Sequence, residues 1–406
     1  MRLCAFGDIV LHDGLKPASG KQYLASLKQE IERSSGRPDL VLANLEAPLT
    51  ESNKPRWSHL PAKKAPPALA GVLSDLPVDF VTLANNHISD YDRRGLADTI
   101  RLVDGLGIKW AGAGWNAEQA RAPILFEKAG LRIGILALAQ PELSAAWEGS
   151  WGAGVLDERY AIAAMKQLSA QVDVAIAYLH FGVEFFGYPT PRQIKMSRSL
   201  IDAGAKLVLG HHPHVAQGFE WYKNGFIAYS LGNFIFPMKL RGHEHIGVGL
   251  MVDIEVDREK VREVRVVPME TRGGLPRVLA GDERREAEDY LAAISEPIAD
   301  ASAMEPIYYR ICRDNFSIHM NALIKYGILK MKPERIASWL HFQSWPQIRQ
   351  LRKDLAGFLF SGRAWDIEKK APFSHGTTVF VWRLVCIAAK CAGLLLPRKW
   401  RKLDLA

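Results

Sequence analysis

The sequence predicts a layered α/β domain followed by a smaller helical region. From Met1 to about Glu270, short apolar segments alternate with helical stretches, a pattern typical of layered α/β domains. The apolar segments show no clean alternation of apolar and polar residues, which indicates strands buried on both faces. With 406 residues, 48% of them hydrophobic and 24% charged, the chain is an ordinary globular protein that exceeds one typical domain.

The strands and helices of this first domain follow one another along the chain. The expected strands are Leu3–Phe6, Leu40–Ala43, Phe80–Leu83, Ile133–Ala137, Val174–Leu179, Lys206–Leu209 and Phe226–Ser230. The expected helices are Gln22–Arg33, Ala68–Leu73, Gly95–Leu106, Ala161–Leu168 and Arg192–Ala203. Two further β-rich segments, Gly247–Val256 and Val261–Pro268, have no helix between them and predict an antiparallel hairpin that closes the domain.

The chain changes character after the hairpin. The charged run Gly281–Asp289 marks a boundary, and a solvated helix turn is a compatible interpretation of the same residues. From Tyr290 to about Ile367 the pattern is helical and rich in aromatic residues. We therefore expect a first domain at residues 1–275, a helical appendage at 282–370 and a basic amphipathic tail at 376–406.

The last apolar segment, Thr378–Leu396, is nearly long enough to span a bilayer. It carries Arg383 and Lys390, and charges in the middle of a membrane are costly. A basic run follows at 398–402, so the segment predicts an amphipathic helix that either lies at a membrane surface or packs on the protein with a solvated basic end. A membrane-spanning helix is the third alternative.

The net charge of +8 is distributed unevenly. Between Ala371 and Ala406, six Lys or Arg residues accompany a single acidic residue, Asp404. Because the basic residues are not interleaved across the first domain, we expect no nucleic-acid partner.

The four cysteines and the N-terminal residues together predict the cellular compartment of the protein. No pair of the four cysteines has C-x-x-C spacing, which argues against a structural zinc site, and Cys4 is expected to be a small buried hydrophobe. Four free thiols are compatible with a reducing compartment, and the residues before Asp8 leave no room for a signal peptide. We expect a cytoplasmic protein, peripheral at the membrane where the tail binds.

Polar clusters follow five of the apolar segments, at the points where the strands should end. The clusters are Gly7-Asp8, Asn44-Leu45-Glu46, Asn85-Asn86-His87, His180 with Glu184, and His211-His212-Pro213-His214. Ligands of open α/β sheets bind beyond the carboxyl ends of the strands. Imidazole suits zinc and iron, while carboxylate and amide oxygens suit harder ions such as manganese. The five clusters therefore predict a metal site for two divalent ions at one edge of a sheet.

Each cluster also has a structural interpretation when it is taken alone. Asp8 after Gly7 is common in turns and helix caps, and Asn44 to Glu46 could form a simple loop. Two amides and a histidine after a buried strand are poor structural choices unless they find partners, so Asn86 is a candidate ligand and His87 a candidate acid.

The histidine-rich cluster gives the strongest signal. Three imidazoles within four residues are rarely structural, and Pro213 fixes its own φ and stiffens the bend between His212 and His214. Glu184 lies four residues after His180. Asn233, in Ser230–Phe234, forms either a hydrogen bond to the site or part of a β-turn, and His12 is a candidate contact near Asp8. His243 and His245 are interpreted as loop residues.

Taken in order, GD, NLE, ANNH, HFGVE, GHHPH and SLGNF resemble the CapA (PgsA-like) capsule-synthesis family, which is associated with poly-γ-glutamate capsules and is similar to calcineurin-like metallophosphoesterases. The resemblance covers roughly Arg2 to Val267. It implies a four-layer α/β/β/α sandwich that holds two divalent ions, with Mn, Fe or Zn as the candidate metals.

The resemblance also implies roles for individual residues. His87 matches the catalytic histidine, and the implied metal ligands are Asp8, Glu46, Asn86, His180, His212 and His214. The residues expected to contact the substrate or to support the ligands are His12, Asn44, Asn85, Glu184, His211 and Asn233.

The chain departs from the phosphoesterase pattern at two motifs. The first motif of those enzymes is Asp-x-His, and here the third position is Val10. Their second motif is Gly-Asp, and here it is Asn44-Leu45-Glu46. We expect His12, Glu184 or His211 to complete the weaker metal site.

Two functions follow from these patterns. The first is a metal-dependent hydrolase of phosphoesters, with His87 as the proton donor. The second is a non-catalytic accessory protein of capsule or exopolymer assembly, which binds an acidic polymer or a phosphorylated intermediate at the membrane.

Overall fold

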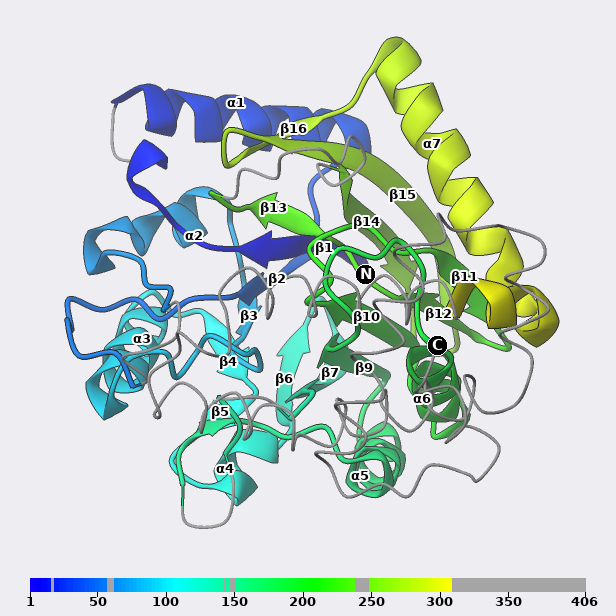
Figure 1. Cartoon of the computed structure of the whole chain (residues 1–406), viewed down its shortest axis with the longest axis horizontal. Helices are drawn as coiled ribbons and strands as arrows, with labels where there is room; N and C mark the ends of the chain where they lie inside the picture. Colours follow the sequence, from blue (N-terminus) through cyan, green and yellow to red (C-terminus); the bar gives the residue numbers. More distant parts are fainter. Residues whose placement is uncertain (16–17, 57–61, 142–143, 147–149, 238–247, 309–406) are drawn as a thin grey trace, which may run out of the picture. The chain divides into compact units, whose positions relative to one another are not determined.

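The computed structural model describes residues 1–15, 18–56, 62–141, 144–146, 150–237 and 248–308. Within these residues the chain forms two large mixed β-sheets with helices on their outer faces (Figure 1). A third, two-stranded sheet pairs β5 (Ala113–Gly114) with β8 (Gly152–Ala153).

The first sheet has a parallel half and an antiparallel half that meet at β1. Its order is β16-β15-β14-β1-β2-β3-β4, and β13 also pairs with β1. The parallel strands are β1 (Arg2–Ile9), β2 (Leu40–Leu45), β3 (Phe80–Thr82), β4 (Lys109–Ala111) and β13 (Asn233–Ile235). The antiparallel strands are β14 (Val248–Val256), β15 (Val261–Arg272) and β16 (Leu275–Val278).

The second sheet has a parallel centre and antiparallel edges. Its order is β11-β12-β10-β9-β7-β6. The parallel centre consists of β7 (Leu131–Ala139), β9 (Val174–His180), β10 (Leu207–His211) and β12 (Gly225–Ala228). The edges are β6 (Ile124–Lys128) and β11 (Phe219–Tyr222).

The main core lies between the two sheets. Alternate residues of β9 belong to different clusters, with Ile176 and Tyr178 in the inter-sheet core and Ala177 and Leu179 in the cluster on the opposite face. Successive side chains of a strand point to opposite faces, so the second sheet is apolar on both sides. This burial explains why the strand sequences show no alternation.

Helices cover the outer faces of the sheets. Near the first sheet lie α1 (Ala18–Ser35), α2 (Gly71–Asp75) and α3 (Arg93–Gly105). Against the second sheet pack α5 (Glu158–Ser169) and α6 (Pro191–Asp202), and the short α4 (Ala117–Arg121) lies beside β5. Helix α6 begins at a capping box of Thr190 with Gln193 and has Pro191 in its first turn.

This arrangement confirms the predicted α/β/β/α sandwich. The seven predicted strands and the closing hairpin are all present, with boundaries that differ by a few residues. The predicted helix Ala68–Leu73 is divided into a 3-10 turn, Pro67–Leu69, and α2. Cys4 is buried in β1, as expected.

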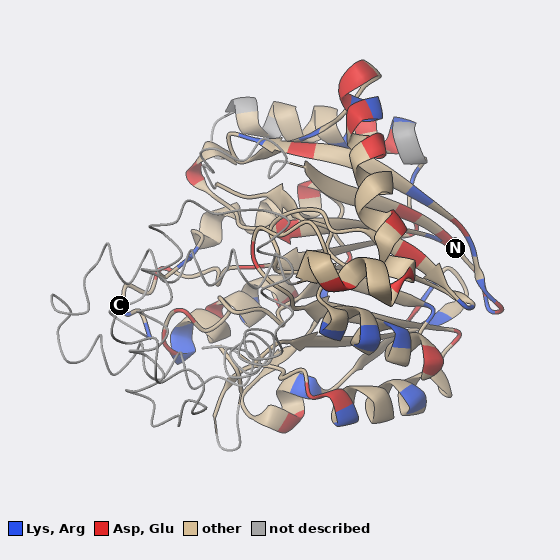
Figure 2. Cartoon of the chain, turned by 45° about the vertical axis from the view of Figure 1, so that its right-hand side comes forward, with Lys and Arg blue, Asp and Glu red and all other residues tan. Residues whose placement is uncertain are grey.

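Helix α7 (Gly281–Ser295) starts at the charged run that marks the predicted boundary. Its first half carries the charges on the surface (Figure 2), while Leu291 and Ile294 join the main core. A 3-10 turn, Glu296–Ala299, and a helical segment at 301–308 follow. The remainder of the predicted appendage and the basic tail lie outside the described residues.

None of the helices in the described part of the chain has both the length and the apolar composition needed to cross a bilayer. The segment Thr378–Leu396, for which membrane contact was predicted, is not among these residues.

Candidate metal centre

The predicted site residues meet where strands of both sheets end. From the first sheet come Asp8 of β1 and Asn44 of β2, with Glu46 just after β2. From the second sheet come His180 and His211, the last residues of β9 and β10. The two carboxyl edges therefore face each other, and side chains that are far apart in the sequence become neighbours.

Asp8, Glu46 and His214 form the centre of the site. All three are buried, and one donor atom from each lies within 4.8 Å of the others. His214 Nδ1 is 3.4 Å from Asp8 Oδ2, and His214 Nε2 is 3.5 Å from Glu46 Oε1. In the described structure, Asp8 Oδ2, both Glu46 carboxylate oxygens and His214 Nε2 are buried with no hydrogen-bond partner.

A second group of donor atoms converges on His180. Its Nε2 atom lies 3.0 Å from Asn86 Oδ1 and 3.1 Å from His212 Nδ1. Burial and the neighbouring His212 hold the pKa of His180 well below its ordinary value, so the imidazole is neutral. A neutral imidazole is the form that binds metals.

Asn44 connects the two groups. Its amide nitrogen donates to Asp8 Oδ1 at 2.8 Å and lies 3.3 Å from His180 Nδ1. Its carbonyl oxygen accepts from Asn85 Nδ2 at 3.1 Å, and the same Asn85 nitrogen donates to the Leu45 carbonyl at 2.8 Å. Asn44 and Asn85 are thus the buried framework of the site, since their side-chain groups are already paired.

His211 supports Asp8 from the second sheet. Its Nδ1 atom lies 2.8 Å from Asp8 Oδ1, and its ring stacks on Tyr178 with centroids 4.7 Å apart. Burial alone would raise the pKa of Asp8, but its interactions with His211 and His214 outweigh burial and hold that pKa well below its ordinary value. Asp8 is therefore the stable negative charge of the site.

The charges of Glu46 and His214 respond to one another. Burial, together with the nearby charge of Asp8, raises the pKa of Glu46 to about 8. Burial would lower the pKa of His214, but Glu46 and Asp8 outweigh it and raise that pKa to about 9. Relative to the unfolded chain, the fold therefore favours the protonated form of each group.

The loop of the paired histidines is strained. His212 has φ 98° and His214 has φ 60°, and both angles fall where non-glycine residues are uncommon. Pro213 lies between them. Such strain costs about 1–3 kcal/mol per residue and persists only where the surroundings enforce it. Here His214 Nδ1 lies 3.0 Å from Asn233 Oδ1, which holds the second ring in place.

His87 has a partner that the sequence analysis missed. Its Nδ1 atom lies 2.7 Å from Asp90 Oδ2, and its Nε2 atom lies 3.9 Å from Glu46 Oε1. Burial lowers the pKa of His87, and Asp90 opposes that shift. Lys63 was also missed, and its Nζ atom lies 3.7 Å from the same Glu46 oxygen. Asp90 follows His87 by three residues, a spacing that could have indicated the pair.

Other predicted residues lie at the margin. His12 is half-buried, and its ring contacts the Gly274 carbonyl at 3.2 Å and the Gly14 nitrogen at 3.2 Å. Glu184 is exposed, and its pKa is lowered because His212 and His214 outweigh the effect of partial burial. His243 and His245 lie outside the described residues.

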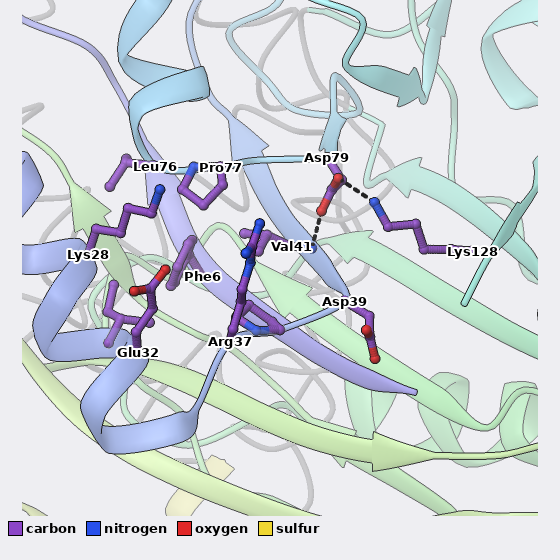
Figure 3. A pocket seen from close by; sticks show the side chains of 12 residues that line it. Phe6, Lys28, Glu32, Arg37, Asp39, Val41, Leu76, Pro77, Asp79 and Lys128 are labelled. Carbon is purple, nitrogen blue, oxygen red and sulfur yellow. Dashed lines mark hydrogen bonds and ion pairs between the residues drawn. The ribbon is translucent and has the colours of Figure 1, made fainter. Parts of the chain in front are cut away.

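A separate pocket of about 160 Å³ opens at the other ends of the parallel strands (Figure 3). Asp39 and Asp79, which precede β2 and β3, line it together with Lys28 of α1. Asp79 is already paired, with Lys128 Nζ at 2.8 Å and the Val41 nitrogen at 2.8 Å. This pocket therefore lacks the unpaired donors of the metal centre.

Comparison with known proteins gives a consistent set of matches. The model of the family described as bacterial capsule synthesis protein PGA_cap matches residues 2–238. The capsule biosynthesis protein CapA of Bacillus anthracis is 27% identical over 284 residues, 67% of this chain and 67% of that protein. The PGA biosynthesis protein CapA of Bacillus subtilis (strain 168) is 26% identical over 287 residues, 69% of this chain and 74% of that protein.

Two solved structures are among those similar to this chain. A phosphatase from Mycoplasma pneumoniae has 13% sequence identity and a TM-score of 0.42, covering 66% of this chain and 93% of its own. A 5'-nucleotidase precursor from Thermus thermophilus has 16% identity and a TM-score of 0.41, covering 74% of this chain and 59% of its own.

Proposed function

Because the chain belongs to the bacterial capsule synthesis protein PGA_cap family, we propose that it is a divalent-metal-dependent hydrolase of phosphoesters. It would act in the synthesis of a capsule or another acidic exopolymer of the poly-γ-glutamate type. Its substrate would be a phosphorylated intermediate or a phosphorylated acidic polymer.

One observation carries the proposal, namely the set of buried and unpaired donor atoms on Asp8, Glu46 and His214. Leaving a buried polar atom unpaired costs about 1–3 kcal/mol, and more for a charged group. A cation among these atoms would satisfy four of them at once. The donor set of two carboxylates and one imidazole suits Mn, Fe or Zn.

We propose two ions. Asp8, Glu46 and His214, which lie close enough together to share a cation, would hold one, and His180, Asn86 and His212 would hold the other. Bound ions would polarise a phosphoryl oxygen and favour the ionisation of water. Asn44 would fix the position of one group of ligands relative to the other, because it contacts both Asp8 and His180.

His87 would handle the proton of the reaction. Its Nδ1 atom donates to Asp90, so the Nε2 atom on the Glu46 side is the one that exchanges a proton with the leaving oxygen. Asp90 fixes the ring and its tautomer. The His87 side chain retains 16% exposure, so it is accessible to a substrate that enters from solvent.

A second candidate is binding without catalysis, and Val10 favours it. Where the phosphoesterase pattern has a histidine, Val10 packs with Ala47 and Phe236 in a small apolar cluster. That position offers no ligand. In this case the protein would bind an acidic polymer or a phosphorylated intermediate as an accessory, with membrane contact through the basic tail.

The test measures metal and hydrolysis on one sample. Full-length protein is analysed by elemental mass spectrometry, and after addition of manganese it is assayed with a generic phosphomonoester and a generic phosphodiester. We expect about two metals per chain, and we expect Glu46→Gln to lose both metal and hydrolysis, because the charge is removed and the shape is kept.

His12→Gln is the matched control, because it alters a histidine that contacts Gly274. It should keep both metal and activity. If the unaltered protein binds metal but hydrolyses neither ester, the accessory role is supported. Protein that binds no divalent ion would refute both candidates.

A further inference from the structure

Two side chains beside the buried carboxylate of Glu46 are partly exposed to solvent. His87 and Lys63 retain 16% and 26% of their side-chain exposure, while Asp8, Glu46 and His214 are buried. His87 Nε2 and Lys63 Nζ lie 3.9 Å and 3.7 Å from the same oxygen, Glu46 Oε1. A substrate that enters toward His87 therefore also meets the Lys63 ammonium.

The backbone of Lys63 is fixed relative to His87. The Lys63 nitrogen donates to Asp90 Oδ2 at 2.7 Å, and His87 Nδ1 lies 2.7 Å from that same oxygen. One carboxylate oxygen thus sets the distance between the two residues. Because this tie uses the main chain of Lys63, a change of its side chain leaves the His87–Asp90 pair intact.

The ammonium group of Lys63 lies over the ring of Phe236, 4.4 Å from its centroid. Phe236 in turn packs against His214, with ring centroids 4.6 Å apart. Within the described residues, the contacts of the ammonium are a long ion pair with Glu46 Oε1 at 3.7 Å and the Phe236 ring, and none of them is a hydrogen bond. Its three donors can therefore bind an incoming acceptor.

Other cations near this loop are engaged elsewhere. Lys64 Nζ donates to the Ser52 carbonyl at 2.7 Å and to Asn53 Oδ1 at 2.8 Å. Arg56 stacks over Trp151 and donates to Ser89 Oγ at 3.0 Å. Lys63 is thus distinguished by having its charged group directed at the metal centre.

We propose that Lys63 binds a phosphoryl oxygen of the substrate and thereby selects phosphorylated substrates at this site. This inference rests on the proposed function, which places the reacting phosphoryl group of the substrate at the metal centre. A charged hydrogen bond contributes about 1.5–3 kcal/mol, so its loss should weaken binding about tenfold to a hundredfold.

The experiment titrates inorganic phosphate into full-length protein with and without manganese, and measures KM and kcat for a phosphomonoester. Lys63→Met should weaken phosphate binding by about tenfold or more and raise KM more than it lowers kcat, with unchanged metal content. Lys63→Arg should restore most of the binding, since it keeps the charge.

Lys28→Met is the matched control, because it removes a lysine charge beside the separate pocket (Figure 3). It should change neither phosphate binding nor KM. Unchanged phosphate binding in Lys63→Met, with altered metal content, would overturn the inference and leave Lys63 as a counter-charge to Glu46.

Two results separate this inference from the proposed function. Phosphate binding that depends on Lys63 in a protein without hydrolysis would support the inference and refute the hydrolase. A parallel titration with glutarate tests whether Lys63 binds a carboxylate group and not a phosphoryl group. Loss of glutarate binding in Lys63→Met, with phosphate binding intact, would overturn the phosphoryl assignment.

Discussion

His211 Nδ1 lies 2.8 Å from Asp8 Oδ1, and this contact joins the last residue of β10 in the second sheet to β1 in the first. The site is therefore built across the seam between the sheets. The orientation of the Asp8 carboxylate depends on a residue 203 positions away in the chain.

His211→Ala should lower the affinity for Mn²⁺ by about 10–100-fold, the usual effect of losing a residue that orients a ligand. The physical reason is that Asp8 loses the partner that fixes one of its oxygens. Titration of metal-free protein with Mn²⁺ measures the change. Affinity equal to that of the unaltered protein would show that Asn44 alone orients Asp8.

The stability of cation-free protein should fall as pH rises from about 6.5 to 9. The pKa values of Glu46 and His214 in the fold are about 8 and about 9, against ordinary values of 4.5 and 6.5. Each group binds its proton more tightly when folded, so its contribution is present at low pH and is lost as pH rises through these values. The lowered pKa values of His180 and His87 act in the opposite direction, but only below about pH 6.5, and that of Asp8 only below about pH 3.8.

Calorimetric Tm values with a chelator should therefore decrease over this pH range, and Glu46→Gln should flatten the curve. With manganese present the trend should disappear, because ligands must lose protons to bind a metal. A chelated protein whose Tm is constant from pH 6 to 9 would contradict the charge assignment.

His87→Gln should reduce kcat about 10²–10⁴-fold, the range for loss of a general acid, while metal content stays unchanged. The donor atoms of the metal centre lie on other residues, so only the proton transfer is removed. Single-turnover assays together with elemental analysis check this. A matching loss of metal would make His87 a ligand instead.

Tyr178→Phe should leave the protein as stable or raise its stability by about 1 kcal/mol, because the buried hydroxyl has no hydrogen-bond partner in the described structure. The stacking on His211 remains, so metal affinity should not change. Tyr229→Phe serves as the control, since that hydroxyl donates to Glu220 and its loss should destabilise. Thermal unfolding of both variants gives the comparison.

The long strands could be predicted because burial on both faces leaves an apolar run in the sequence. Two of the short strands could not. β4 (Lys109–Ala111) and β13 (Asn233–Ile235) have three residues each and begin with a polar residue, whereas β3, which is equally short, begins a largely apolar run that continues to Ala84. β13 is placed by a close approach, because a Cβ at Gly7 would lie 2.1 Å from the Gly232 carbonyl oxygen.

The family predicted from the ordered motifs is confirmed, whereas hydrolysis stays a prediction. The motifs indicated the donor residues because imidazoles and carboxylates at strand ends are locally conspicuous. Asp90 was detectable only through its spacing of three residues from His87. Lys63 gave no such signal in a loop rich in charges, because its position depends on how residues 62–65 lie against Glu46 and Asp90, which no local periodicity encodes.

The order in which the chain is synthesised also determines when the site can form. Asp8 and Asn233 are neighbours across β1 and β13, so the first and last residues of the centre belong to opposite ends of the domain sequence. Chains fold as they emerge at about 5–20 residues per second, which leaves Asp8 and Glu46 waiting roughly ten seconds or more for His214 and Asn233. A nascent chain that ends before Asn233 cannot assemble the centre, so cation binding must follow the emergence of His214 and Asn233.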